Sequence, residues 1–72
     1  MLNSQQLSDI LRANGYKVTP QRLAVYEALA ATKSHPTAEM LFSTLQPNYP
    51  SMSFATVYKT VEILQKINVI QI

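Results

Sequence analysis

Cysteine is absent from this sequence, which excludes disulfide bonds and thiolate metal sites within it. The single glycine excludes a phosphate-binding P-loop and a dinucleotide fingerprint, because both motifs need several glycines. One histidine cannot hold a metal alone, since a stable site takes three or more ligands. No apolar run approaches the ~18 residues of a transmembrane helix. The first residues, MLNSQQLSDI, lack the basic and apolar regions of a signal peptide.

Acidic residues are also few, and the four present fall on separate predicted helices. They are Asp9, Glu27, Glu39 and Glu62. Paired-carboxylate catalysis needs two such groups held close together. We therefore expect solvated acids and no enzyme. Six lysines and arginines leave a net charge of +2, which permits nucleic-acid binding without requiring it.

The chain does contain enough apolar residues, 47% of 72, for one small globular domain. Apolar spacing predicts helices over residues 4–14, 20–31, 38–46 and 53–68, and a strand over residues 69–72. The expected N-caps are Ser4, Thr19, Thr37 and Ser53. The expected core contains Leu7, Ile10, Leu11, Leu23, Tyr26, Leu29, Ala30, Met40, Leu41, Phe42, Leu45, Phe54, Val57, Val61 and Leu64.

The last two predicted helices are joined by residues 47–51, a turn stiffened by two prolines. This order is typical of a helix-turn-helix motif, in which the second helix reads DNA. A strand directly after that helix suggests the first strand of a β-hairpin wing. The fold class we predict is mainly α, a winged helix-turn-helix with an extra N-terminal helix and a wing truncated after its first strand. Because a lone strand is not a stable ending, we expect the chain to be a fragment.

The exposed side of the predicted helix over residues 53–68 has a distinctive composition. It carries Ala55, Lys59, Glu62 and Lys66, flanked by Thr56 and Tyr58. Small, hydroxylated, aromatic and cationic side chains can contact bases, thymine methyls and phosphates in a major groove. The alternative interpretation is an ordinary amphipathic helix with a solvated outer face.

Basic residues beyond this helix could extend the same surface. Lys17 and Arg22, with Lys59 and Lys66, are the candidate phosphate contacts. The alternative is that these are scattered solvated charges. His35 is either a polar loop histidine or a metal ligand whose partners lie outside this chain.

Three motifs favour the DNA-binding interpretation: GYKVTPQR at residues 15–22, HPTAE at residues 35–39 and SFATVYK at residues 53–59. With these motifs in this order and spacing, the chain resembles the N-terminal DNA-binding domain of the ferric uptake regulator (Fur) family of bacterial metal- and peroxide-responsive repressors. The resemblance covers nearly the whole chain. It implies that residues 1–72 are one winged-helix DNA-binding domain, with residues 53–68 as its recognition helix.

The resemblance also implies roles for individual residues. Tyr58 would pack against bases, and Lys59 would reach bases or phosphate. Lys17 maps to a minor-groove contact and Arg22 to a backbone phosphate contact. The whole implied DNA-binding set is Lys17, Arg22, Ser53, Ala55, Thr56, Tyr58 and Lys59.

His35 maps to a ligand of the family's regulatory divalent metal, which would be iron or manganese, with zinc as the alternative. The other ligands would come from a C-terminal dimerisation domain that this chain lacks, so no metal is expected to bind tightly to residues 1–72. The implied partners are double-stranded DNA, as an AT-rich palindromic operator, and a second copy of the full-length protein. The implied location is the cytoplasm, with no membrane association.

The branch of the family is less strongly indicated. Residues 45–53, LQPNYPSMS, look more like peroxide-sensing repressors than iron-uptake regulators. A zinc-uptake regulator of the same family is one alternative. A winged-helix module that docks a protein partner through the same helix, without touching DNA, is another.

Overall fold

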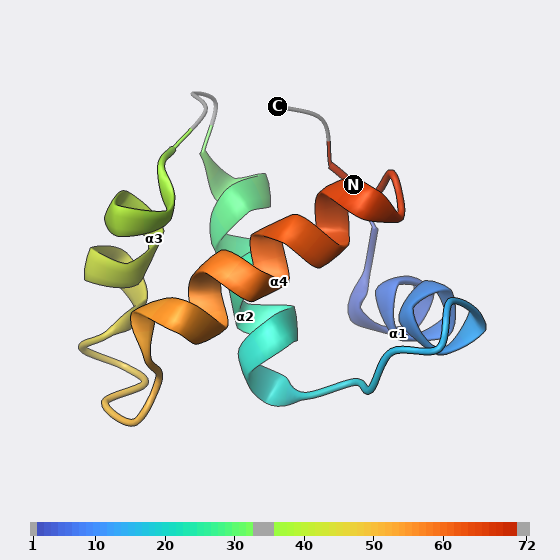
Figure 1. Cartoon of the computed structure of the whole chain (residues 1–72), viewed down its shortest axis with the longest axis horizontal. Coiled ribbons are helices and arrows are strands. Elements are labelled where there is room, and N and C mark those ends of the chain that lie inside the picture. The colour runs from blue at the N-terminus through green and yellow to red at the C-terminus, as the bar shows by residue number, and fades with distance from the viewer. Residues whose placement is uncertain (1, 33–35, 71–72) are drawn as a thin grey trace.

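A computed structural model describes residues 2–32 and 36–70. The described residues form four helices, α1 (Ser4–Ala13), α2 (Pro20–Ala31), α3 (Ala38–Leu45) and α4 (Phe54–Lys66). The helical part of the predicted architecture is therefore confirmed. In Figure 1, α4 crosses in front of α2, with α3 to one side and α1 to the other.

Polar side chains define where each helix begins. Thr19, Thr37 and Ser53 each accept a first-turn backbone N–H, as predicted. The predicted cap of α1 was wrong, because Asn3 and not Ser4 occupies that position. Asn3 Oδ1 accepts the N–H of Gln6 at 2.8 Å, and Gln6 Oε1 accepts the N–H of Asn3 at 3.0 Å. This reciprocal capping box satisfies two helix-end donors, which Ser4 could not do from its position one residue later.

Two helices end in the same way, with a residue of positive φ. Gly15 follows α1 with φ 82°, and Asn68 follows α4 with φ 61°. Beyond them, the N–H of Tyr16 donates to the carbonyl of Leu11, and the N–H of Val69 to that of Leu64, both at 2.9 Å. These bonds are the signature of the Schellman motif, which turns the chain sharply at a helix end. α4 therefore ends two residues before the predicted boundary at 68.

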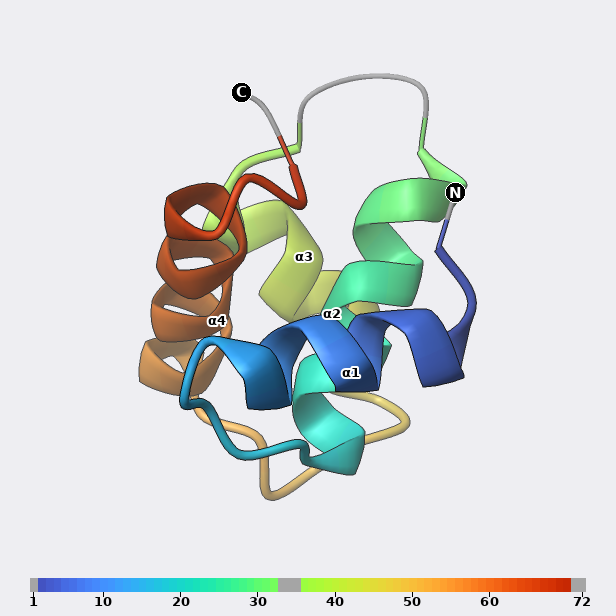
Figure 2. The same cartoon turned by 90° about the vertical axis from the view of Figure 1, so that its right-hand side faces the viewer.

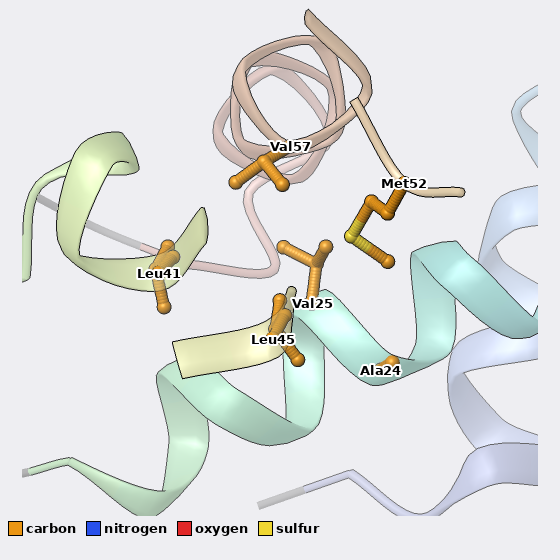
Figure 3. Close-up of a cluster of buried hydrophobic side chains, with 6 residues drawn as sticks. All are labelled: Ala24, Val25, Leu41, Leu45, Met52 and Val57. Atoms are coloured by element: carbon orange, nitrogen blue, oxygen red, sulfur yellow. The ribbon is translucent and has the colours of Figure 1, made fainter. Parts of the chain in front are cut away.

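One hydrophobic cluster holds the helix-turn-helix together, and we call it the turn-side cluster. Its buried members are Ala24, Val25, Leu41, Leu45, Met52 and Val57. Figure 3 shows these side chains converging from α2, α3, the turn before α4, and α4 itself. Val25 and Val57 are completely buried at its centre. This packing sets how the first turns of α4 sit on α2 and α3.

A second cluster, which we call the leading-helix cluster, attaches α1. Its buried members are Leu7, Leu11, Tyr26, Ile63 and Leu64. The Tyr26 hydroxyl lies at the edge of this cluster and accepts the backbone N–H of Leu2 at 3.0 Å. In Figure 2, α1 lies across α2 with one end close to α4, and the α1–α2 loop passes beneath.

α2 contributes to both clusters, and this explains where the core prediction failed. Ala24 and Val25 are buried, although they were not among the predicted core residues. Leu23 and Leu29 are only half-buried. A helix packed on more than one side has no single apolar stripe, so its spacing does not identify its buried face. On α3, Met40 was also wrongly placed in the core, because its side chain is 56% exposed.

The predicted wing strand is not formed in the described part of the chain. Val69 and Ile70 are not in a strand, and residues 71–72 lie outside the described residues. Both side chains instead pack against the leading-helix cluster. A strand needs a neighbour to accept its backbone hydrogen bonds, and residues 2–32 and 36–70 contain none. Across these same ranges, no helix has the length and apolar character needed to cross a membrane.

Candidate nucleic-acid interface

The outer face of α4 carries several exposed side chains of the predicted interface. Ala55, Tyr58, Lys59 and Glu62 are all exposed on it, while Val57 on the opposite side is buried. α4 lies on the outside of the helix-turn-helix (Figure 1). The predicted face is therefore accessible to a partner as large as a DNA duplex.

A surface hollow brings α2 and α4 together beside this face. Arg22 lines it from the first turn of α2, and Ala55, Thr56 and Lys59 line it from the first two turns of α4. Four of the seven predicted DNA-binding residues thus meet at one place, although Arg22 lies more than thirty positions before the other three in the sequence. Two of them carry a positive charge, so the hollow suits an anionic group.

The hollow also contains Thr60, which the sequence did not single out. Its side chain is 2% exposed, and its Oγ1 donates to the carbonyl of Thr56 at 2.7 Å. The hydroxyl is thereby satisfied within α4. Thr60 therefore lines the hollow as a buried residue, and its hydroxyl is not free to bind an external group.

The start of α4 presents two hydroxyls. Ser53 Oγ accepts the N–H of Thr56 at 3.1 Å, and the two hydroxyl oxygens lie 3.0 Å apart. The first turn of α4 contains no acidic residue. The positive end of the helix dipole is therefore not neutralised, and it favours an anion such as phosphate.

Tyr58 lies on the other flank of the exposed face, with an aromatic neighbour. Its ring centroid is 6.4 Å from that of Phe54, which in turn packs edge-on against Phe42 of α3 at 6.0 Å. Tyr58 is still 54% exposed. The interface therefore has an aromatic flank towards α3 and a cationic flank, with Lys59 and Arg22, towards α2.

The loop between α1 and α2 adds the remaining predicted residue, Lys17. Its side chain is exposed, while its carbonyl oxygen accepts a hydrogen bond from Arg22 Nη1 at 2.7 Å. Its neighbour Tyr16 shares a second hollow with Lys59 and Lys66 of α4. Sequence reasoning missed Tyr16, although an apolar residue two positions beyond a helix C-cap is a recognised packing position.

Among the described residues, the cations of this surface have no acidic partner. Within residues 2–32 and 36–70, Lys17, Arg22, Lys59 and Lys66 form no ion pair. Glu62 lines the same hollow as Lys59 and Lys66 but bonds to neither. The positive charges therefore remain available to an external anion.

The predicted metal ligand cannot be placed in this way, because His35 lies outside the described residues. Among the residues that are described, no three His, Cys, Asp or Glu side chains gather into a group that could hold a metal ion. The described residues alone therefore do not supply a ligand set.

Sequence comparison relates the chain to known proteins. The sequence profile of the ferric uptake regulator family matches residues 13–72. The chain is 38% identical over 61 residues to the peroxide-responsive repressor PerR of Staphylococcus saprophyticus, covering 85% of this chain and 41% of that protein. The corresponding repressor of Staphylococcus aureus is 34% identical over the same 61 residues. These relatives are repressors, in agreement with the prediction that the chain does not belong to an enzyme.

Solved structures give the same relationship in three dimensions. The structure of GAS PerR-Zn-Zn matches with a TM-score of 0.81 and 31% identity, over 89% of this chain and 41% of that one. A structure of PerR from Streptococcus pyogenes, concerned with peroxide sensing and gene regulation, matches with a TM-score of 0.80 and 31% identity, over 92% of this chain and 46% of that one. The chain thus spans less than half the length of the proteins it matches.

Proposed function

This chain belongs to the ferric uptake regulator family, and from that premise we propose that it is the DNA-binding part of a metal-dependent, peroxide-responsive repressor. The observation that carries the proposal is the hollow where Arg22 of α2 meets Ala55, Thr56 and Lys59 of α4. A cationic site beside the first turns of an exposed helix is what a DNA backbone needs while those turns enter a groove.

In this proposal one flank of α4 contacts bases and the other faces phosphate. Tyr58 and Ala55 contact base edges and thymine methyls, for which exposed aromatic and small apolar groups are suited. Lys59 faces phosphate with Arg22 beside it, and Ser53 and Thr56 offer the helix N-terminus to a second phosphate. Lys17 reaches towards the minor groove from the α1–α2 loop.

The far half of the α4 face contributes less. Glu62 is exposed there and would repel a phosphate placed nearby. We therefore place the DNA against the first two turns of α4. The proposed operator is an AT-rich palindrome bound by a homodimer, because two-fold symmetry in the protein requires it in the DNA.

The regulatory metal enters the proposal through the relatives. One of the similar structures is GAS PerR-Zn-Zn, and His35 is the residue of this chain that would serve as a ligand. A bound divalent cation would supply positive charge and a link between parts of the protein. The remaining ligands would come from outside residues 1–72.

The test is operator binding by the full-length protein, followed by fluorescence anisotropy across a salt series. Tyr58→Ala and Lys59→Ala should each weaken binding about tenfold, the size of one well-made base contact. Lys59→Ala should also lower the log–log salt slope by about 0.9, whereas Tyr58→Ala should leave the slope unchanged.

A matched control is Arg12→Ala, which removes an exposed cation from the last turn of α1. It should leave operator affinity within about twofold, since Arg12 lines neither of the two hollows beside α4. Operator binding that survives the Tyr58 and Lys59 changes together would show that another face reads the DNA. Absence of any binding of the wild-type protein to duplex DNA at low salt would overturn the function itself.

A further inference from the structure

The hydrogen bond between Arg22 and the backbone of Lys17 has a consequence for how the interface is built. Arg22 Nη1 donates to the Lys17 carbonyl oxygen at 2.7 Å, five residues back along the chain. A hydrogen bond from a charged guanidinium is about twice as strong as a neutral one. The side chain that lines the α4 hollow therefore also holds the α1–α2 loop.

The rest of the loop is already tied down on either side of this bond. On one side, the N–H of Tyr16 donates to Leu11 at 2.9 Å within the Schellman motif. On the other side, Thr19 Oγ1 accepts the N–H of Arg22 at 3.1 Å, which fixes the start of α2. The Lys17 carbonyl lies between these anchors, and the Arg22 side chain bonds to it.

The side chains of the loop alternate between half-buried and exposed, so the bond from Arg22 affects where the Lys17 side chain points. Tyr16 and Val18 are half-buried and pack against the leading-helix cluster, whereas Lys17 is exposed between them. An extended backbone points successive side chains to opposite sides. Holding the Lys17 carbonyl therefore sets the direction in which the lysine side chain leaves the protein.

From this geometry we propose that Arg22 is a positioning residue, which acts on DNA mainly through Lys17 and not mainly as a phosphate contact of its own. The inference rests on the proposed function. Arg22 bonds to the loop and lines the hollow beside α4, so this bond relates the position of Lys17 to the first turns of the reading helix. A lysine side chain is long and flexible. Fixing its backbone limits the positions that its ammonium group can occupy.

The test is a double-mutant cycle in the full-length protein with Lys17→Gln, Arg22→Gln and the double variant. Affinity for the operator is measured across a salt series. If Arg22 acts through Lys17, Arg22→Gln weakens binding about fivefold in the wild-type background and less than about twofold when Lys17 is already glutamine. The double variant then loses about 0.9 of salt slope, the same as Lys17→Gln alone.

Independent phosphate contacts predict a different result. The two changes would then be additive in free energy, and the double variant would lose about 1.8 of salt slope. That outcome overturns the proposal. Thermal unfolding of each variant checks that the fold is retained, so that a loss of affinity is not a loss of structure.

A second measurement needs no DNA and therefore separates this proposal from the proposed function. The backbone order parameter of Val18, whose N–H belongs to the peptide group held by Arg22, is measured by ¹⁵N relaxation. It should fall from about 0.85 towards 0.6 in Arg22→Gln and stay unchanged in Lys17→Gln. An unchanged value in Arg22→Gln would show that the loop is not held by this bond, whether or not the protein binds DNA.

Discussion

The turn-side cluster joins helices that follow one another in the chain, whereas the leading-helix cluster joins α1 to the distant end of α4. The first cluster holds the turns of α4 that carry Ala55, Tyr58 and Lys59. The second holds the loop that carries Lys17. α2 and α4 take part in both, so the two halves of the proposed interface are separate in their packing but share the same two helices.

Because of this difference, a mutation in the turn-side cluster should destabilise more of the domain than a mutation in the leading-helix cluster. The turn-side cluster supports α3 and the start of α4, and its loss removes the helix-turn-helix. The leading-helix cluster attaches α1 to helices that already have a second cluster. Its loss should loosen α1 and the Lys17 loop first.

The largest effect is expected from Leu41→Ala, which empties a site that is 2% exposed in the turn-side cluster. Removing a buried leucine side chain costs about 3 kcal/mol of unfolding free energy, through lost transfer energy and the cavity left behind. Urea unfolding followed by circular dichroism measures the change.

The neighbouring Met40→Ala is the control for this change, because Met40 lies on the same helix and is 56% exposed. It should change stability by less than about 0.5 kcal/mol. Equal losses from the two variants would mean that α3 does not pack through the face described here.

A smaller and more local effect is expected from Leu7→Ala in the leading-helix cluster, where Leu7 is 1% exposed. We expect a loss of about 2 kcal/mol that is concentrated in α1, because α2 and α4 keep the turn-side cluster. Native-state hydrogen exchange should show lower protection in α1 and little change at Val25 and Val57. Uniform loss of protection would show instead that the two clusters unfold as one unit.

The smallest effect on stability is expected from the helix caps, one near each cluster. Ser53→Ala and Asn3→Ala each remove a side-chain acceptor for a first-turn N–H, at a cost of about 1 kcal/mol in unfolding free energy. Only Ser53→Ala should also weaken operator binding, since Ser53 starts the reading helix.

A further variant separates the two roles of Ser53. Ser53→Asp keeps the cap but adds a negative charge where phosphate is proposed, so stability should be retained while operator affinity falls. Anisotropy and thermal unfolding on the same samples measure both. An aspartate variant that binds DNA as well as the wild type would remove Ser53 from the proposed contacts.

Much of this architecture could be predicted because it is encoded in local sequence. Thr19-Pro20 and Ser53 mark helix starts through chemistry that acts over three residues. The position of Asn3 could also have been found, since Asn3 and Gln6 have capping-box spacing. Ala24 and Val25 could not, because which side of α2 is buried depends on helices that arrive from elsewhere in the chain.

The candidate site also combines features that local sequence predicts with features that depend on tertiary packing. Residue types and motif spacing identified Lys17, Arg22, Ala55, Thr56 and Lys59 as candidates, but nothing in their spacing said that Arg22 would touch the Lys17 backbone. Its spacing from the end of α1 marks Tyr16 as a packing residue, but its place beside Lys59 and Lys66 depends on where α1 ends relative to α4.

The sequence by itself determined the helices, three of their four caps, the stiff turn between α3 and α4, and the residue types on the outer face of α4. These features depend on hydrogen bonds and periodicities that span a few residues. Only the tertiary structure decided which side of α2 is buried, which cations meet, and what Arg22 holds. Those outcomes depend on packing between residues that are distant in the chain, and local propensity carries no information about it.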